Sequence, residues 1–97
     1  MNNHNTFLLK EAFKDFLNTY PFIKDKVNEN RITEVWGKLM GQMILKHTDK
    51  LTVRNRVLSV EVNSATLRNE LNYAKEKIRN TINNELGDNL IDEVRIR

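Results

Sequence analysis

Basic side chains occur at spacings that could form two phosphate-binding groups. Arg68, Lys75 and Arg79 stand at i, i+7 and i+11, which places them on one face of a continuous helix. A row of basic side chains is a common means of following a nucleic-acid backbone. Glu70 and Glu76 lie nearby, so an ordinary solvated helix face is the alternative.

A second possible group combines a hairpin with the last strand of the chain. Its members are Arg54, Arg56, Arg95 and Arg97. If the strands pair, all of them except Arg56 project from the sheet face opposite the helices. Glu61 and Glu93 are their obvious acidic neighbours. The group could hold phosphate or an acidic partner surface, and a solvated sheet face is the alternative.

Two aromatic residues could stack on nucleic-acid bases, as aromatic side chains do in single-strand binders. Trp36 lies among apolar residues at helical spacing, so we expect it in the core. Tyr73 stands at the edge of an apolar stripe, and its hydroxyl is expected to reach solvent. Tyr73 is therefore a candidate for contact with a nucleic acid or a protein partner, with a place at the edge of the core as the alternative.

No catalytic or metal-binding pattern stands out. The chain has no cysteine and two isolated histidines, which excludes a conventional structural zinc site. His47 ends a helical pattern, where it would cap carbonyls or complement the helix dipole. No serine has the features of a nucleophile elbow, and no Gly-rich phosphate loop is present. We expect no enzymatic activity, cofactor, metal or small-molecule substrate.

Composition favours one small domain over residues 1–97. The 97 residues are 39% hydrophobic and carry a net charge of +3, which permits nucleic-acid binding without requiring it. No apolar stretch is long enough to cross a membrane, and MNNHNT does not resemble a secretory signal. We expect a soluble cytoplasmic protein that does not bind membranes.

The second half predicts two strands, a helix and a third strand. Apolar residues alternate with polar ones at Leu51, Val53, Leu58, Val60 and Val62. Asn55 and Arg56 form a tight turn between the strands, although the preferred Gly is missing at the second position.

The third long helix follows the hairpin directly. Asn63 or Ser64 can accept hydrogen bonds from its first free amides. Its apolar residues recur three or four apart and are Leu67, Leu71, Ala74, Ile78, Ile82 and Leu86. Gly87 is expected to end the helix in the left-handed conformation, and residues 90–97 return to alternation as a strand.

The first half predicts two long helices. The first covers residues 6–20, with Thr6 as its N-cap and its end set by Pro21. A polar stretch over residues 22–30 follows as a short helix or a loop. The second long helix runs from about residue 32 to 46.

Gly37 and Gly41 lie four apart within the second helix, which suggests that another backbone passes close by. The resulting order α-α-β-β-α-β predicts an α+β domain with a small three-stranded sheet and its helices on one face.

Three segments in sequence resemble the DciA family. They are WGKLMGQMILKHT from Trp36, the hairpin LTVRNRVLSVEV and the helix start NSATLRNEL, and the resemblance covers about residues 32–97. It implies a KH-like domain that binds the bacterial replicative helicase and single-stranded DNA and assists helicase loading during replication. The Gly-x-x-Gly loop with which KH domains clamp nucleic acid is missing from this chain.

Two other functions fit the same sequence. One is a general RNA- or DNA-binding KH-like module, and the other is a structural protein-interaction domain. A nucleic-acid binder must lose affinity steeply with added salt, whereas an adaptor held by apolar contacts should lose little. A net charge of +3 favours the weaker salt dependence.

Overall fold

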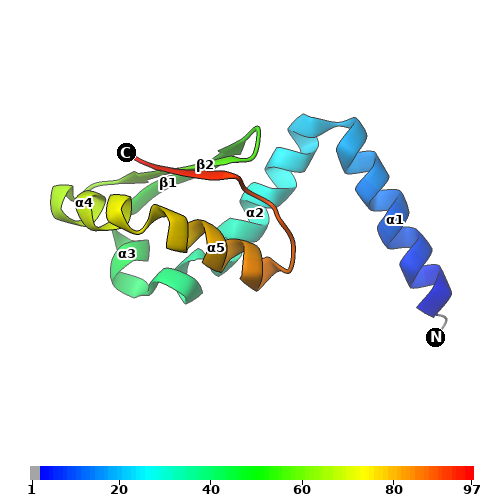
Figure 1. The fold of residues 1–97 in the computed structure, drawn as a ribbon, viewed down its shortest axis with the longest axis horizontal. Helices are drawn as coiled ribbons and strands as arrows, with labels where there is room; N and C mark the ends of the chain where they lie inside the picture. The colour runs from blue at the N-terminus through cyan, green and yellow to red at the C-terminus, as the bar shows by residue number, and fades with distance from the viewer. Residues whose placement is uncertain (1–2) are drawn as a thin grey trace.

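The computed structural model describes the chain from residue 3 to 97, and its side chains from residue 6 onward. The elements follow one another as α1 (Asn3–Thr19), α2 (Pro21–Met40), α3 (Gln42–Lys46), β1 (Thr48–Arg54), β2 (Val57–Val62), α4 (Ala65–Tyr73), α5 (Lys75–Leu86) and β3 (Glu93–Ile96). This arrangement confirms the predicted α+β class and the order of helices and strands. Helices α3, α4 and α5 lie on one side of the strands, and α1 extends away from the rest (Figure 1).

The sheet is mixed and has the strand order β1-β2-β3. β1 and β2 pair in antiparallel fashion, whereas β2 and β3 are parallel. Asn55 and Arg56 connect β1 to β2 with φ angles of 50° and 65°, as a tight primed turn requires. The predicted turn is therefore confirmed, with a bulky residue where Gly is preferred.

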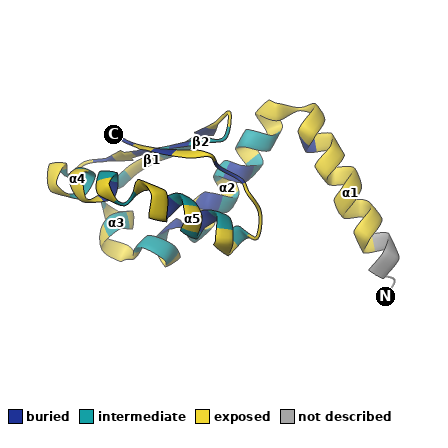
Figure 2. Ribbon diagram, in the orientation of Figure 1, coloured by how far each residue is buried: buried dark blue, intermediate teal, exposed yellow. Residues whose placement is uncertain are grey.

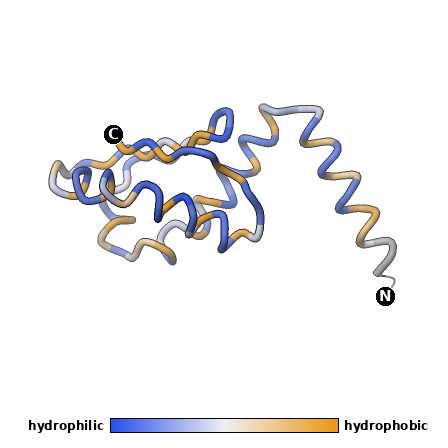
Figure 3. Tube along the Cα trace, viewed as in Figure 1, coloured by the Kyte–Doolittle hydropathy of each residue, from blue (hydrophilic) through white to orange (hydrophobic). Residues whose placement is uncertain are grey.

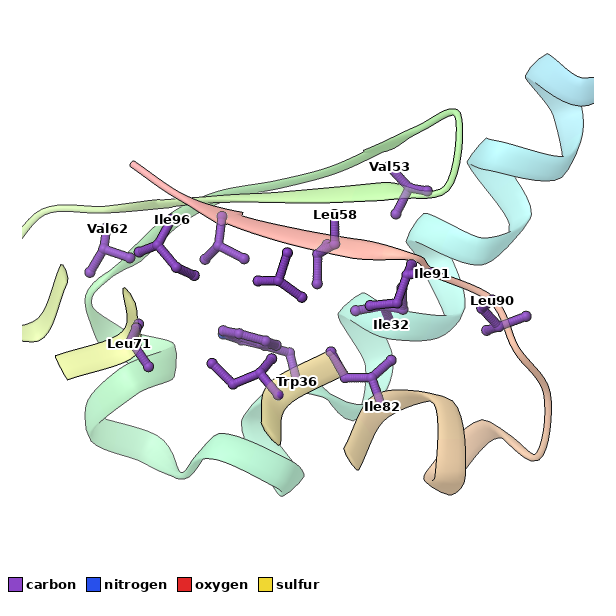
Figure 4. Packing of buried hydrophobic residues seen from close by; sticks show 13 residues of the cluster. Ile32, Trp36, Val53, Leu58, Val62, Leu71, Ile82, Leu90, Ile91 and Ile96 are labelled. Atoms are coloured by element: carbon purple, nitrogen blue, oxygen red, sulfur yellow. The ribbon is translucent and has the colours of Figure 1, made fainter. Parts of the chain in front are cut away.

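The core lies between the sheet and the helices. Val53, Leu58, Val60, Val94 and Ile96 point from the strands toward the helices, in agreement with the predicted alternation. The Trp36 ring is fully buried, and Figure 4 shows it beneath the sheet near Ile82 of α5. Its Nε1–H donates to Thr48 Oγ1 at 3.0 Å, which satisfies the only polar atom of the indole.

Two predicted helix boundaries in the first half were wrong. α1 begins at Asn3, so Thr6 lies inside the helix and is not its N-cap. The expected end at Pro21 is confirmed, but the chain resumes helical structure at once because proline is well suited to the first helical position. Residues 22–30 therefore belong to α2, which is 20 residues long.

The expected helix from residue 32 to 46 is interrupted at Gly41. This residue has φ 93° and ψ 165°, a conformation almost restricted to glycine. At Gly37 the close approach is of a different kind, since a Cβ there would lie 2.7 Å from Leu45 Cδ2 of α3 and that side chain would have to shift. The close neighbour of Gly37 is thus a side chain, and not the backbone that we expected.

The predicted third long helix consists of two helices that meet at Ala74. Ser64 is the N-cap of α4, since its Oγ accepts the Leu67 N–H at 3.2 Å. Gly87 ends α5 in the left-handed conformation, as predicted. The break at Ala74 separates Arg68 on α4 from Lys75 and Arg79 on α5, so the three do not share one continuous helix face.

Replacing Gly41 with Ala should lower the free energy of unfolding by about 1–3 kcal/mol, because a Cβ is strained in this backbone conformation. Urea denaturation followed by circular dichroism measures the change. Gly87→Asn is the control and should lower the free energy of unfolding by less than Gly41→Ala does, since asparagine tolerates the left-handed conformation of that residue. If Gly41→Ala is as stable as the wild type, the described break between α2 and α3 is contradicted.

Candidate functional site

The sheet face opposite α4 and α5 forms a groove of about 940 Å³. The first half of α2 makes one wall, and the outward side chains of the three strands make the floor. We call this the sheet groove, and its lining comprises Phe22, Asp25, Lys26, Glu29, Lys50, Thr52, Val53, Arg54, Asn55, Val57, Ser59, Glu61, Arg95 and Arg97. The structure thereby brings together Arg54, Arg95 and Arg97, the three arginines assigned to this face from the sequence.

Strand register explains why these side chains share one face. Thr52 pairs with Ser59, which pairs with Arg95 on the other side. Lys50 pairs with Glu61 in the same alternation. Because successive residues of a strand point to opposite faces, the residues that alternate with the buried ones must all face the groove.

Two carboxylates of α2 attach the groove wall to the edge of β1. Glu29 Oε2 accepts the Val53 N–H at 3.0 Å, and Asp25 Oδ2 accepts the Asn55 N–H at 3.1 Å. Lys26 also lies 3.5 Å from the other oxygen of Glu29. These contacts satisfy edge amides that would otherwise be open to another strand, and they hold the carboxylates at the wall of the groove.

The basic groups of the sheet groove differ in whether they have partners. Arg95 donates to Glu93 at 2.7 Å. In the part of the chain that the structure describes, Lys50, Arg54 and Arg97 form no ion pair with a carboxylate. The Phe22 side chain lies at the same groove and is 70% exposed. Unpaired cations beside an exposed aromatic ring are the combination used to bind single strands without sequence preference.

Arg56 is held outside the sheet groove. Its Nε and Nη2 atoms donate to the two carboxylate oxygens of Asp92, each at 2.9 Å, and Nη2 also donates to the Asn89 carbonyl. The hydrogen bond to Arg56 lowers the pKa of Asp92 and raises the pKa of Arg56. Arg56 therefore connects the hairpin to the segment before β3 and is already engaged.

The basic residues predicted on the third helix lie on two helices that meet at Ala74. Arg68 Nη2 donates to the Val62 carbonyl at 2.8 Å and is half-buried. Arg79 forms an ion pair with Glu76 at 2.8 Å and reaches the Asp92 carbonyl. Lys75 is exposed on α5. Arg68, Lys75 and Arg79 therefore do not form the expected phosphate-binding row on one helix face.

Tyr73 is the most exposed large hydrophobic residue of the described chain, at 94%. It ends α4, directly before the break at Ala74. Its side chain stands clear of the core, in agreement with the expected solvent-facing hydroxyl. It remains a candidate contact, away from the residues that line the sheet groove.

Among the groove residues that sequence reasoning did not assign to a site are Lys50 and Phe22. Lys50 could have been found, because it alternates outward with Thr52 and Arg54 in the pattern that identified β1. Phe22 carried no such signal, since its place depends on how α2 crosses the edge of the sheet. Across residues 3–97, no three His, Cys, Asp or Glu side chains gather to hold a metal ion, and each helix is too short or too polar to span a bilayer.

Comparison with known proteins gives one match. A family model described as "Dna[CI] antecedent, DciA" covers residues 8–96. The chain belongs to the DciA family. No curated protein and no solved structure matches. Membership confirms the resemblance found in the sequence and extends it toward the N-terminus, since the match includes most of α1.

DciA membership supports a helicase-loader-type role in DNA replication, with the replicative helicase as the associated partner. Such an adaptor role is consistent with the expected lack of catalysis. A role in replication also implies the cytoplasmic location that we expected.

The left-handed backbone at Arg56 can be tested by two substitutions of this residue. Arg56→Ala and Arg56→Gly both lose the bond to Asp92, but only Gly removes the strain of the left-handed backbone. The Ala variant should be less stable than the Gly variant by about 1–2 kcal/mol in urea denaturation. At Ser59, within β2, the order should reverse, because Gly weakens a strand. An Arg56→Gly variant less stable than Arg56→Ala would contradict the described turn.

Proposed function

We propose that this chain is a non-catalytic adaptor that binds the replicative helicase and holds single-stranded DNA in the sheet groove. The observation that carries the DNA part is that Lys50, Arg54 and Arg97, which have no carboxylate partner within the described residues, line one groove with the exposed Phe22. DciA membership supports the helicase part.

The sheet groove suits an extended strand of nucleic acid. Lys50 and Arg54 are four residues apart on β1, which separates them by about 13 Å along the strand. They can therefore contact different phosphates of one DNA strand while Phe22 stacks on a base. Asp25, Glu29 and Glu61 also line the groove, so binding to DNA should be weak and should fall further as salt rises.

Weak DNA binding is sufficient for an adaptor. A module that contacts helicase and DNA together raises the concentration of one near the other, and it needs no hydrolysis to do so. The two contacts differ in physical character. Ionic contacts with DNA weaken as salt rises, whereas a helicase contact made through apolar surface is largely maintained.

The double variant Arg54→Glu/Arg97→Glu should lose most binding to a fluorescent oligothymidine of about 15 nucleotides. Removing two phosphate contacts should also reduce the slope of log affinity against log salt by about 1.4. Fluorescence anisotropy at several salt concentrations measures both quantities. Lys75→Glu/Lys77→Glu on α5 makes the same change in net charge and should bind nearly as well as the wild type.

The same titration separates stacking from charge. Phe22→Ala should weaken binding by about 1–3 kcal/mol, which is the contribution of one stacked base, and leave the salt slope unchanged. Equal loss of binding in the two double variants would show that only net charge matters, and would remove the sheet groove as the DNA site.

The helicase contact is tested by size-exclusion chromatography with light scattering. The full chain should co-elute with the replicative helicase of the same organism, and the complex should persist at raised salt. A hexameric ATPase unrelated to replication is the control and should not retain the chain. No complex at tens of micromolar, with or without single-stranded DNA, would reject the adaptor function and favour a general nucleic-acid-binding module.

A further inference from the structure

Helix α1 carries an apolar face that its own chain leaves uncovered. Figure 2 shows α1 exposed along nearly its whole length, and Figure 3 shows hydrophobic positions recurring along it. Among its described side chains only Leu17 is buried. We call one side of this exposed set the α1 apolar face. Its members are Leu9, Phe13 and Phe16 of α1 and Tyr20, which directly follows the helix, each between 46% and 71% exposed.

The spacing within this face is that of a helix seam. Leu9, Phe13, Phe16 and Tyr20 follow one another at intervals of four, three and four residues, the pattern by which two helices interlock their side chains. Phe16 and Tyr20 already contact each other, with ring centroids 4.9 Å apart. The charged residues of α1 fall outside this seam; they are Lys10, Glu11, Lys14 and Asp15. The apolar faces of two copies can therefore pack against each other without burying a charge.

The area of the face also fits a pair of identical chains. A fully exposed aromatic side chain presents about 150–250 Å², so four half-exposed apolar side chains present on the order of 400 Å². Two such faces in contact remove about 800 Å² from water, a size typical of weak, transient protein contacts. A face of uncharged residues is complementary to itself, as a twofold interface requires.

We infer that the α1 apolar face is a dimerisation surface, and that its occupant is the α1 helix of a second copy of this chain. The dimer presents two sheet grooves, because the residues of the seam do not line the groove. A contact of this size predicts a reversible dimer that dissociates on dilution.

Light scattering on the full chain tests the dimer, over concentrations from about 5 to 200 μM. The mass should rise from 11.5 kDa toward twice that value. Phe13→Ser/Phe16→Ser should remain at 11.5 kDa throughout, with an unchanged circular dichroism spectrum because both side chains are exposed. Glu11→Ser/Lys14→Ser makes two changes on the polar side of the same helix and should dimerise as the wild type does.

A wild-type chain that stays monomeric at the highest concentration would overturn the inference. So would equal dimerisation of the two double variants, because the contact would then lie elsewhere. A monomeric wild type whose helicase complex is lost only in Phe13→Ser/Phe16→Ser would assign the face to the helicase instead. The DNA titration of the sheet groove is independent of all these outcomes.

Discussion

The burial of Trp36 is the constraint on which the rest of this structure depends. Its ring fills the space beneath the sheet, and its N–H donates to Thr48 Oγ1, which in turn donates to the Ile44 carbonyl at 2.7 Å. An indole N–H buried without a partner would cost about 1–3 kcal/mol. The partner is 12 residues further along the chain, and the break at Gly41 with the short α3 brings it back to the ring.

This one-sided core determines what remains available for function. The strands direct their apolar side chains toward Trp36 and α5, which leaves the opposite face to polar and basic residues. The second half of α2 supplies core residues, and its first half forms the wall of the sheet groove through Asp25 and Glu29. Because these carboxylates bond to backbone amides, the unpaired cations of the groove stay accessible.

Local sequence signals predicted the elements that depend on neighbours along the chain. Gly87 could be assigned as a helix end, and the N-cap could be narrowed to Asn63 or Ser64, because each signal acts within its own helix. Periodicity could not detect the breaks at Gly41 and Ala74, since the apolar spacing continues across both. The ion pair of Arg56 could not be predicted from the sequence either, because its partner Asp92 lies 36 positions further along the chain.

The sequence by itself determined the order of elements, the hairpin and the buried side of each strand, because side-chain alternation and helix capping act over a few residues. It also supported the DciA family. Only the tertiary structure decided which basic residues are free. Arg56 and Arg68 are engaged by groups from other elements, and Arg79 pairs with Glu76 of its own helix. Within the described residues, Lys50, Arg54 and Arg97 form no ion pair, and they line one groove with Phe22. The physical reason is that ion pairs and groove walls depend on distance in space, which packing sets and spacing along the chain does not encode.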